Sequence, residues 1–198
     1  MHADWSDERL MMAYRDGDAD AFTALYGRYR GSLHRYLVHH CGSPAVAEDL
    51  YQDVWIKVVN ARADYEPLAR FSTWLFRIAR NRLIDHYRRQ SSQPVASATT
   101  RASPEDDDPD EEEACFAGLC APDHERPDAL VERHDKARRI SEALASLPAP
   151  QREAFLLAEE AGLTLDEIAL ATDSGRETAK SRLRYALNKL RHSLQDLL

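Results

Sequence analysis

Apolar residues recur at three- and four-residue spacing along most of this chain, which predicts helices rather than strands. In the first half the pattern predicts a helix up to Tyr14, a second from about Ala21, and two more over residues 44–61 and 72–90. Ser72 or Thr73 can act as the N-cap of the fourth helix.

The last third of the chain predicts a helix-turn-helix after two helices that are separated at Pro148 and Pro150. Thr164 can cap a short helix over residues 165–171, with Glu167 at capping-box spacing. The letters TDSG predict a turn, and a final helix follows over residues 176–195.

Two alanines suit the close crossing of such a pair of helices. From the short helix, Leu165, Ile168 and Ala169 can pack on the final helix at Ala179, Leu183, Ala186 and Leu190. Because Ala169 and Ala179 are small, we expect the close crossing of a helix-turn-helix.

A change of composition separates the two helical parts. Of the formal charge of -8, residues 94–128 carry -9, and EDDDPDEEE places eight carboxylates in nine positions. Such a run repels itself and cannot bury enough apolar surface to offset its ordering entropy. We therefore predict an all-α protein of two small domains, over residues 1–90 and 129–198, joined by a flexible acidic linker over 91–128.

The third helix has two distinct faces. At 100° per residue one face is apolar and predicts a core stripe: Ala47, Leu50, Tyr51, Val54 and Val58. The opposite face is acidic and polar with one large apolar residue: Asp49, Gln52, Asp53 and Ile56. This second face is either a solvated surface or a docking face for a basic partner.

The fourth helix mixes aromatic, basic and amide side chains. Leu75, Phe76, Ala79 and Leu83 are expected to face the core. A different stripe holds Trp74, Arg77, Asn81, Asp85 and Arg88, with Arg80, Arg82 and Arg89 at its flanks. Guanidiniums bind phosphates, rings stack on unpaired bases, and Asn can pair with a base edge. The alternative is an ordinary surface helix whose Trp covers the core.

The final helix directs its basic side away from the expected core. Arg176, Glu177, Thr178, Lys180, Ser181, Arg182 and Arg184 lie at the end that would enter a major groove. These residue types read bases and hold phosphates, whereas an ordinary helical hairpin would not need them.

Three motifs in this order resemble the extracytoplasmic-function sigma factors, a group of bacterial RNA polymerase subunits with two helical domains. They read AEDLYQDVWIKVV, FSTWLFRIARNRLIDHYRR and RETAKSRLRYALNKLR. Thr172, Asp173 and Ala179 depart from the family, which usually has larger apolar residues or Gly in this turn.

The resemblance implies roles for the three surfaces. Asp49, Gln52, Asp53 and Ile56 would dock the core polymerase. The residues expected to read and open the −10 element, including a base-capturing loop, are Tyr65, Arg70, Phe71, Ser72, Trp74, Arg77, Arg80, Asn81, Arg88 and Arg89. The final helix would read the −35 element.

The resemblance further implies that core RNA polymerase and promoter DNA are partners, together with an anti-sigma factor that is commonly membrane-anchored. A stand-alone helix-turn-helix regulator that binds duplex DNA without polymerase remains the alternative. An enzyme is not expected, because the chain has no Gly-rich phosphate loop and no nucleophile with a base. We expect a cytoplasmic protein without cofactor or metal, whose three cysteines are reduced thiols. Whether Cys115 and Cys120 have a redox or metal role stays open at this point.

Overall fold

The computed structural model describes residues 2, 4–92 and 127–195, and within them it holds helices and turns but no strand. This confirms the prediction of an all-α fold. The helices are α1 (Asp7–Arg15), α2 (Ala19–Cys41), α3 (Pro44–Asn60), the 3-10 helix η1 (Ala61–Asp64), α4 (Phe71–Ser92), α6 (Pro127–Ala145), α7 (Ala149–Glu159), α8 (Leu165–Ala171) and α9 (Arg176–Ser193).

Local signals set most of the helix boundaries. The Asp18 side chain accepts hydrogen bonds from backbone N–H groups in the first turn of α2. The helix ends at Cys41, and Gly42 follows as its C-cap in a left-handed conformation with φ of 66°. Pro44 occupies the first turn of α3, where its missing N–H costs nothing.

The start of α4 differs from the prediction. Ser72 and Thr73 were expected to cap this helix, but it begins at Phe71, so both residues lie inside its first turn and are buried. The Phe71 N–H instead donates to Oε1 of Glu8 on α1, at 2.9 Å. The cap is supplied from a distant part of the sequence.

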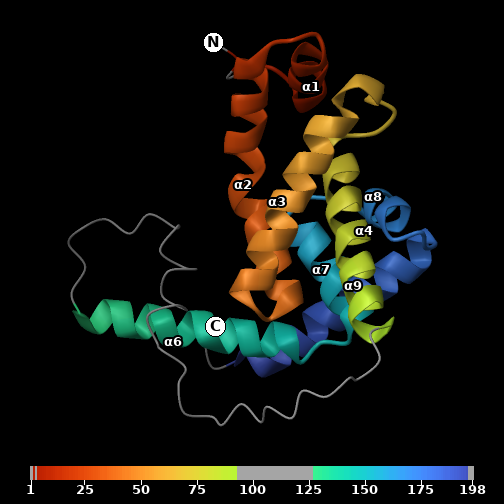
Figure 1. Cartoon of the computed structure of the whole chain (residues 1–198). Helices are drawn as coiled ribbons and strands as arrows, with labels where there is room; N and C mark the ends of the chain where they lie inside the picture. The colour runs from red at the N-terminus through yellow and green to blue at the C-terminus, as the bar shows by residue number, and fades with distance from the viewer. Residues whose placement is uncertain (1, 3, 93–126, 196–198) are drawn as a thin grey trace.

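Helices α1 to α4 form the N-terminal module, a bundle in which α2 packs against α1, α3 and α4 (Figure 1). The predicted core stripes of α3 and α4 are buried, and Trp55 joins them with 7% of its surface exposed. From α2, Leu33, Tyr36 and Leu37 are fully buried in the same core.

Helices α6 to α9 form the C-terminal module, in which α7 and α8 both pack against α9. The small side chains of Ala179 and Ala169 allow α8 and α9 to cross closely. Ala179 is fully buried and Ala169 is 9% exposed. Ile168, Ala186 and Leu190 are buried around them.

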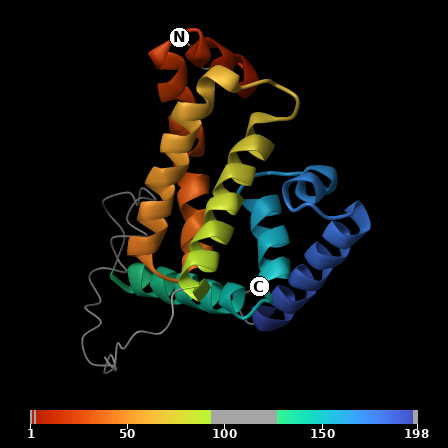
Figure 2. The same cartoon turned by 45° about the vertical axis from the view of Figure 1, so that its right-hand side comes forward.

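The two modules lie against each other. Helix α4 contacts α8, and α2 contacts α6 and α7. Figures 1 and 2 both show α6 lying across one end of the N-terminal bundle. The predicted linker lies mostly outside the described residues, as do Cys115 and Cys120, while α4 and α6 extend into its two ends.

Candidate nucleic-acid interface

The turn between α8 and α9 is held by hydrogen bonds of its own side chains. Thr164 and Glu167 form the predicted capping box at the start of α8. The Thr172 hydroxyl donates to the carbonyl of Ile168 at 2.7 Å, and it lies 2.9 Å from Ser174 Oγ. Asp173 takes a φ of 52°, which Asp tolerates better than most residues. The unusual TDS letters therefore form a defined turn.

The outer face of α9 presents the predicted DNA-contacting side chains to solvent. Five of them are exposed and two are half-buried: Arg176, Glu177, Thr178, Lys180 and Arg184, then Ser181 and Arg182. Arg176 is 2.9 Å from Asp166, and Lys180 is 3.6 Å from Glu177. These pairs are solvent-exposed and weak, so a phosphate can replace the carboxylate.

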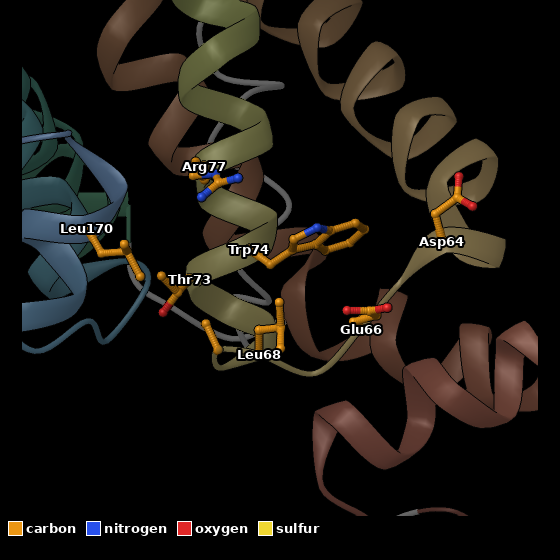
Figure 3. Close-up of a pocket in the computed structure, with 8 residues that line it drawn as sticks. Asp64, Glu66, Leu68, Thr73, Trp74, Arg77 and Leu170 are labelled. Atoms are coloured by element: carbon orange, nitrogen blue, oxygen red, sulfur yellow. The ribbon is translucent and has the colours of Figure 1, made fainter.

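A hollow of about 250 Å³ opens beside the start of α4 (Figure 3). It is lined by Asp64, Glu66, Leu68, Ala69, Thr73, Trp74, Arg77 and Leu170. Leu68 is 88% exposed on the loop that precedes α4. The hollow combines an aromatic ring, a guanidinium and two carboxylates, which are the groups needed to hold a planar polar ligand.

Three of the predicted loop residues lie beneath this hollow instead of lining it. Tyr65, Phe71 and Ser72 are each at most 2% exposed. The rings of Tyr65 and Phe71 pack against Trp74, with centroids 5.1 and 5.7 Å away. Burial raises the pKa of Tyr65 to about 12, so this ring stays neutral and serves as support for Trp74.

Further along α4, Arg77, Asn81, Arg88 and Arg89 are exposed on the surface. Arg88 is 3.3 Å from Asp85 one turn earlier. Trp74, Arg77, Asn81 and Arg88 share one side of α4, as the periodicity predicted, and Arg89 lies at the flank of this stripe.

Two predicted nucleic-acid contacts face the C-terminal module instead. Arg80 Nε donates to Glu153 Oε1 at 2.8 Å, and its other nitrogens lie 3.4 Å from Asp173 and from the Thr172 carbonyl. Burial raises the pKa of Glu153, and Arg80 opposes that rise. Arg70 lies 3.5 Å from Glu167. Both guanidiniums are engaged by carboxylates of the other module.

The acidic face of α3 lies on the surface of the N-terminal module. Asp49, Gln52 and Ile56 are exposed, and Ile56 keeps 56% of its surface accessible. Asp53 is half-buried, because its carboxylate forms an ion pair with Arg82 of α4. The acidic face that periodicity predicted is therefore exposed except at Asp53, with Ile56 as its one large apolar side chain.

Sequence reasoning missed several participants. Arg82 was placed only at the flank of the α4 stripe, and the lining residues Asp64, Glu66 and Leu68 were not singled out. The only sequence signal for these residues was that they lie next to predicted site residues. Nothing local indicated that Glu153 would meet Arg80.

Within residues 2, 4–92 and 127–195, no group of three or more His, Cys, Asp and Glu side chains is arranged to hold a metal ion. None of the helices in this part of the chain is long and apolar enough to cross a membrane.

Comparison of the sequence with known protein families finds a match in each of the two modules. The family described as sigma-70 region 2 matches residues 25–93, and sigma-70 region 4 matches residues 143–192. The RNA polymerase sigma factor CarQ of Myxococcus xanthus is 30% identical over 187 residues, covering 94% of this chain and 97% of CarQ. The ECF RNA polymerase sigma factor RpoE of Cereibacter sphaeroides is 33% identical and covers 93% of each chain.

Two solved structures share the fold. CnrH, in complex with the cytosolic domain of CnrY, has a TM-score of 0.65 at 22% identity and covers 96% of this chain and 97% of its own. The sigma factor RpoE of Bartonella quintana, in complex with the anti-sigma factor NepR, has a TM-score of 0.62 at 22% identity. That match covers 88% of this chain and 96% of RpoE.

Proposed function

We propose that this chain, which belongs to the extracytoplasmic-function (ECF) group of sigma-70 family RNA polymerase sigma factors, directs promoter-specific initiation by core RNA polymerase. The observation that carries the proposal is the order of three surfaces on two sigma modules. The acidic face of α3 is suited to docking a basic partner. The stripe on α4 and the basic face of α9 are suited to binding DNA, so one chain carries all three surfaces. We assign residues 1–90 and 129–198 to the two domains, and 91–128 to the linker.

Helix α9 would read the −35 element in the major groove. Arg176, Lys180, Arg182 and Arg184 would hold phosphates, which fixes the register of the helix. Glu177, Thr178 and Ser181 are placed to discriminate bases, since Glu accepts from cytosine and Thr contacts the thymine methyl.

Helix α4 and its preceding loop would read and open the −10 element. Unstacking one base costs a few kcal/mol, which binding of the open strand can offset without ATP. The hollow beside Trp74 would receive an extruded base, with Asp64 and Glu66 as acceptors for its amino groups. Arg77, Asn81, Arg88 and Arg89 would hold the displaced strand, and Tyr65, Phe71 and Ser72 would support the loop from within.

Arg80 would join this surface only after the modules separate, because its side chain is 16% exposed and pairs with Glu153 of the C-terminal module. Arg70 is more exposed and lies 3.5 Å from Glu167, so a phosphate can replace that carboxylate.

The α3 face would dock a basic element on the largest subunits of the core polymerase. Asp49, Gln52 and Asp53 supply charge and hydrogen-bond acceptors, and Ile56 supplies an apolar anchor. An anti-sigma factor is a further expected partner, because the related RpoE of Bartonella quintana was solved with one. We place the protein in the cytoplasm, as a DNA-binding initiation factor and not an enzyme.

Transcription in vitro tests this function. Purified protein and bacterial core polymerase, mixed on a library of promoter fragments, should start transcripts from a subset that shares −10 and −35 sequences. A stand-alone regulator would bind duplex DNA by itself and would not be retained by core polymerase in a pull-down. If no complex and no transcript formed, the sigma function would be refuted.

A further inference from the structure

The docking face of α3 and the basic side of α4 meet across a hollow of about 200 Å³. Its walls carry Val46, Asp49, Leu50, Asp53, Arg82, His86 and Arg89. Acidic groups come from α3 and cationic groups from α4, so the hollow joins two surfaces to which different partners were assigned above.

Arg82 is the most enclosed cation of this hollow. Its side chain is only 14% exposed, its Nη2 pairs with Asp53 Oδ2, and its Nε lies buried with no hydrogen-bond partner among the described residues. A buried guanidinium is costly unless it is paired, so Arg82 is held in place by the carboxylate. It is therefore poorly placed to reach a DNA phosphate at the surface.

Asp53 has the opposite exposure. Its side chain is 43% accessible although one oxygen meets Arg82. A carboxylate has about four acceptor positions, so pairing with one guanidinium leaves others available to a second donor. The exposed Asp49 lies on the same hollow one turn earlier.

We propose that Arg82 is a positioning residue for partner docking, which fixes the Asp53 carboxylate at the α3 surface in the orientation that a cationic group of the polymerase meets. A carboxylate that is already held loses less side-chain freedom on binding than one that rotates in solvent. Arg82 acts through Asp53 and does not itself touch the partner. This inference rests on the docking role proposed for α3.

A double-mutant cycle tests the inference on the full-length protein, with affinity for purified bacterial core polymerase as the readout. Asp53→Asn and Arg82→Met should each weaken binding about fivefold. The double variant should bind no more weakly than Asp53→Asn alone, because Arg82 has no carboxylate left to orient. Arg82→Lys, which keeps the charge but loses the fork of donors, should fall between Arg82→Met and the unaltered protein.

Arg30→Met is the matched control, since Arg30 is an exposed cation of α2 in the same module. It should leave core affinity unchanged. Thermal unfolding of every variant checks the fold, and Arg82→Lys carries the test if Arg82→Met does not fold.

The outcomes separate the two proposals. Unchanged affinity of Asp53→Asn would refute the docking role of Asp53 itself. Weaker binding by Asp53→Asn with normal binding by Arg82→Met would refute only the positioning role. An additive double variant would also overturn it, because Arg82 would then act independently of Asp53.

Discussion

His40 lies near the end of α2, and its Nε2 is buried without a hydrogen-bond partner among the described residues. The Tyr36 ring packs against it with centroids 4.7 Å apart. Burial lowers the pKa of His40 to about 3, and the nearby Arg152 charge adds to this effect. His40 is therefore neutral in the folded protein at every ordinary pH.

This burial predicts a loss of stability in mild acid. The unfolded chain binds a proton at His40 near pH 6.5, but the folded chain does so only near pH 3. Stability should fall as pH drops below about 6.5, by about 2 kcal/mol at pH 5 for this residue. Urea unfolding at pH 7 and pH 5 measures the loss, which His40→Gln should reduce. His192→Gln, at an exposed site on α9, should leave it as it is.

Arg184 is exposed on α9 with its guanidinium over the Tyr185 ring, 5.1 Å from the centroid. As a phosphate contact, Arg184→Ala should weaken −35 binding nearly equally for all sequences. It should also reduce the dependence of log affinity on log salt by about 1. Titrating polymerase holoenzyme against duplex variants measures both quantities. A loss confined to one base pair would instead assign Arg184 to base reading.

At the scale of single elements, the N-terminus of α4 depends on a residue of α1. Glu8→Ala removes the acceptor of the Phe71 N–H and should destabilise the protein by about 1–2 kcal/mol. Glu8→Gln keeps an acceptor oxygen and should cost less. Chemical denaturation of both variants gives the comparison, and equal losses would mean that the charge rather than the acceptor matters.

Helices with local signals were predictable, and contacts between distant segments were not. The stripe from Ala47 to Val58 and the Thr164 capping box both follow from spacing, because each depends on residues within a few turns. The Glu8 cap joins residues 63 positions apart, and no periodicity encodes such a pair. The same distinction explains why Ser72 was taken for a cap although the fold buries it.

The candidate site divides in the same way. Periodicity placed Trp74 and Arg77 on one stripe, since exposure on a helix follows its repeat. It could not predict that Arg80, at the flank of this stripe, would pair with Glu153 of the other module. Which groups occupy an interface depends on how modules dock, and local sequence carries no signal for that.

At the scale of the whole molecule, the modules are joined by ion pairs between arginines of the first and carboxylates of the second. Arg35 contacts Glu160 at 2.8 Å, in addition to the pairs made by Arg80 and Arg70. Each partly exposed pair contributes about 1 kcal/mol or less, and salt screens it. The contact between the modules should therefore weaken as ionic strength rises.

A charge swap tests this contact. Glu160→Arg places a second positive charge beside Arg35, and the repulsion should expand the protein. Small-angle X-ray scattering should then give a larger radius of gyration. Arg35→Glu in the same chain should restore the compact form. Glu159 is an exposed neighbour on α7, and Glu159→Arg should leave the radius of gyration unchanged. If Glu160→Arg stayed compact at low salt, the ion pair would not hold the modules together.

The support of Trp74 by buried rings has one more consequence. The chain has three tryptophans; Trp55 is enclosed in the core, and the Arg9 guanidinium covers Trp5 at 3.9 Å from its centroid. Only the indole of Trp74 borders the hollow proposed for an extruded base. The fluorescence of Trp74 should therefore fall when a nucleobase stacks on its indole. This intrinsic signal would report strand opening without an attached dye.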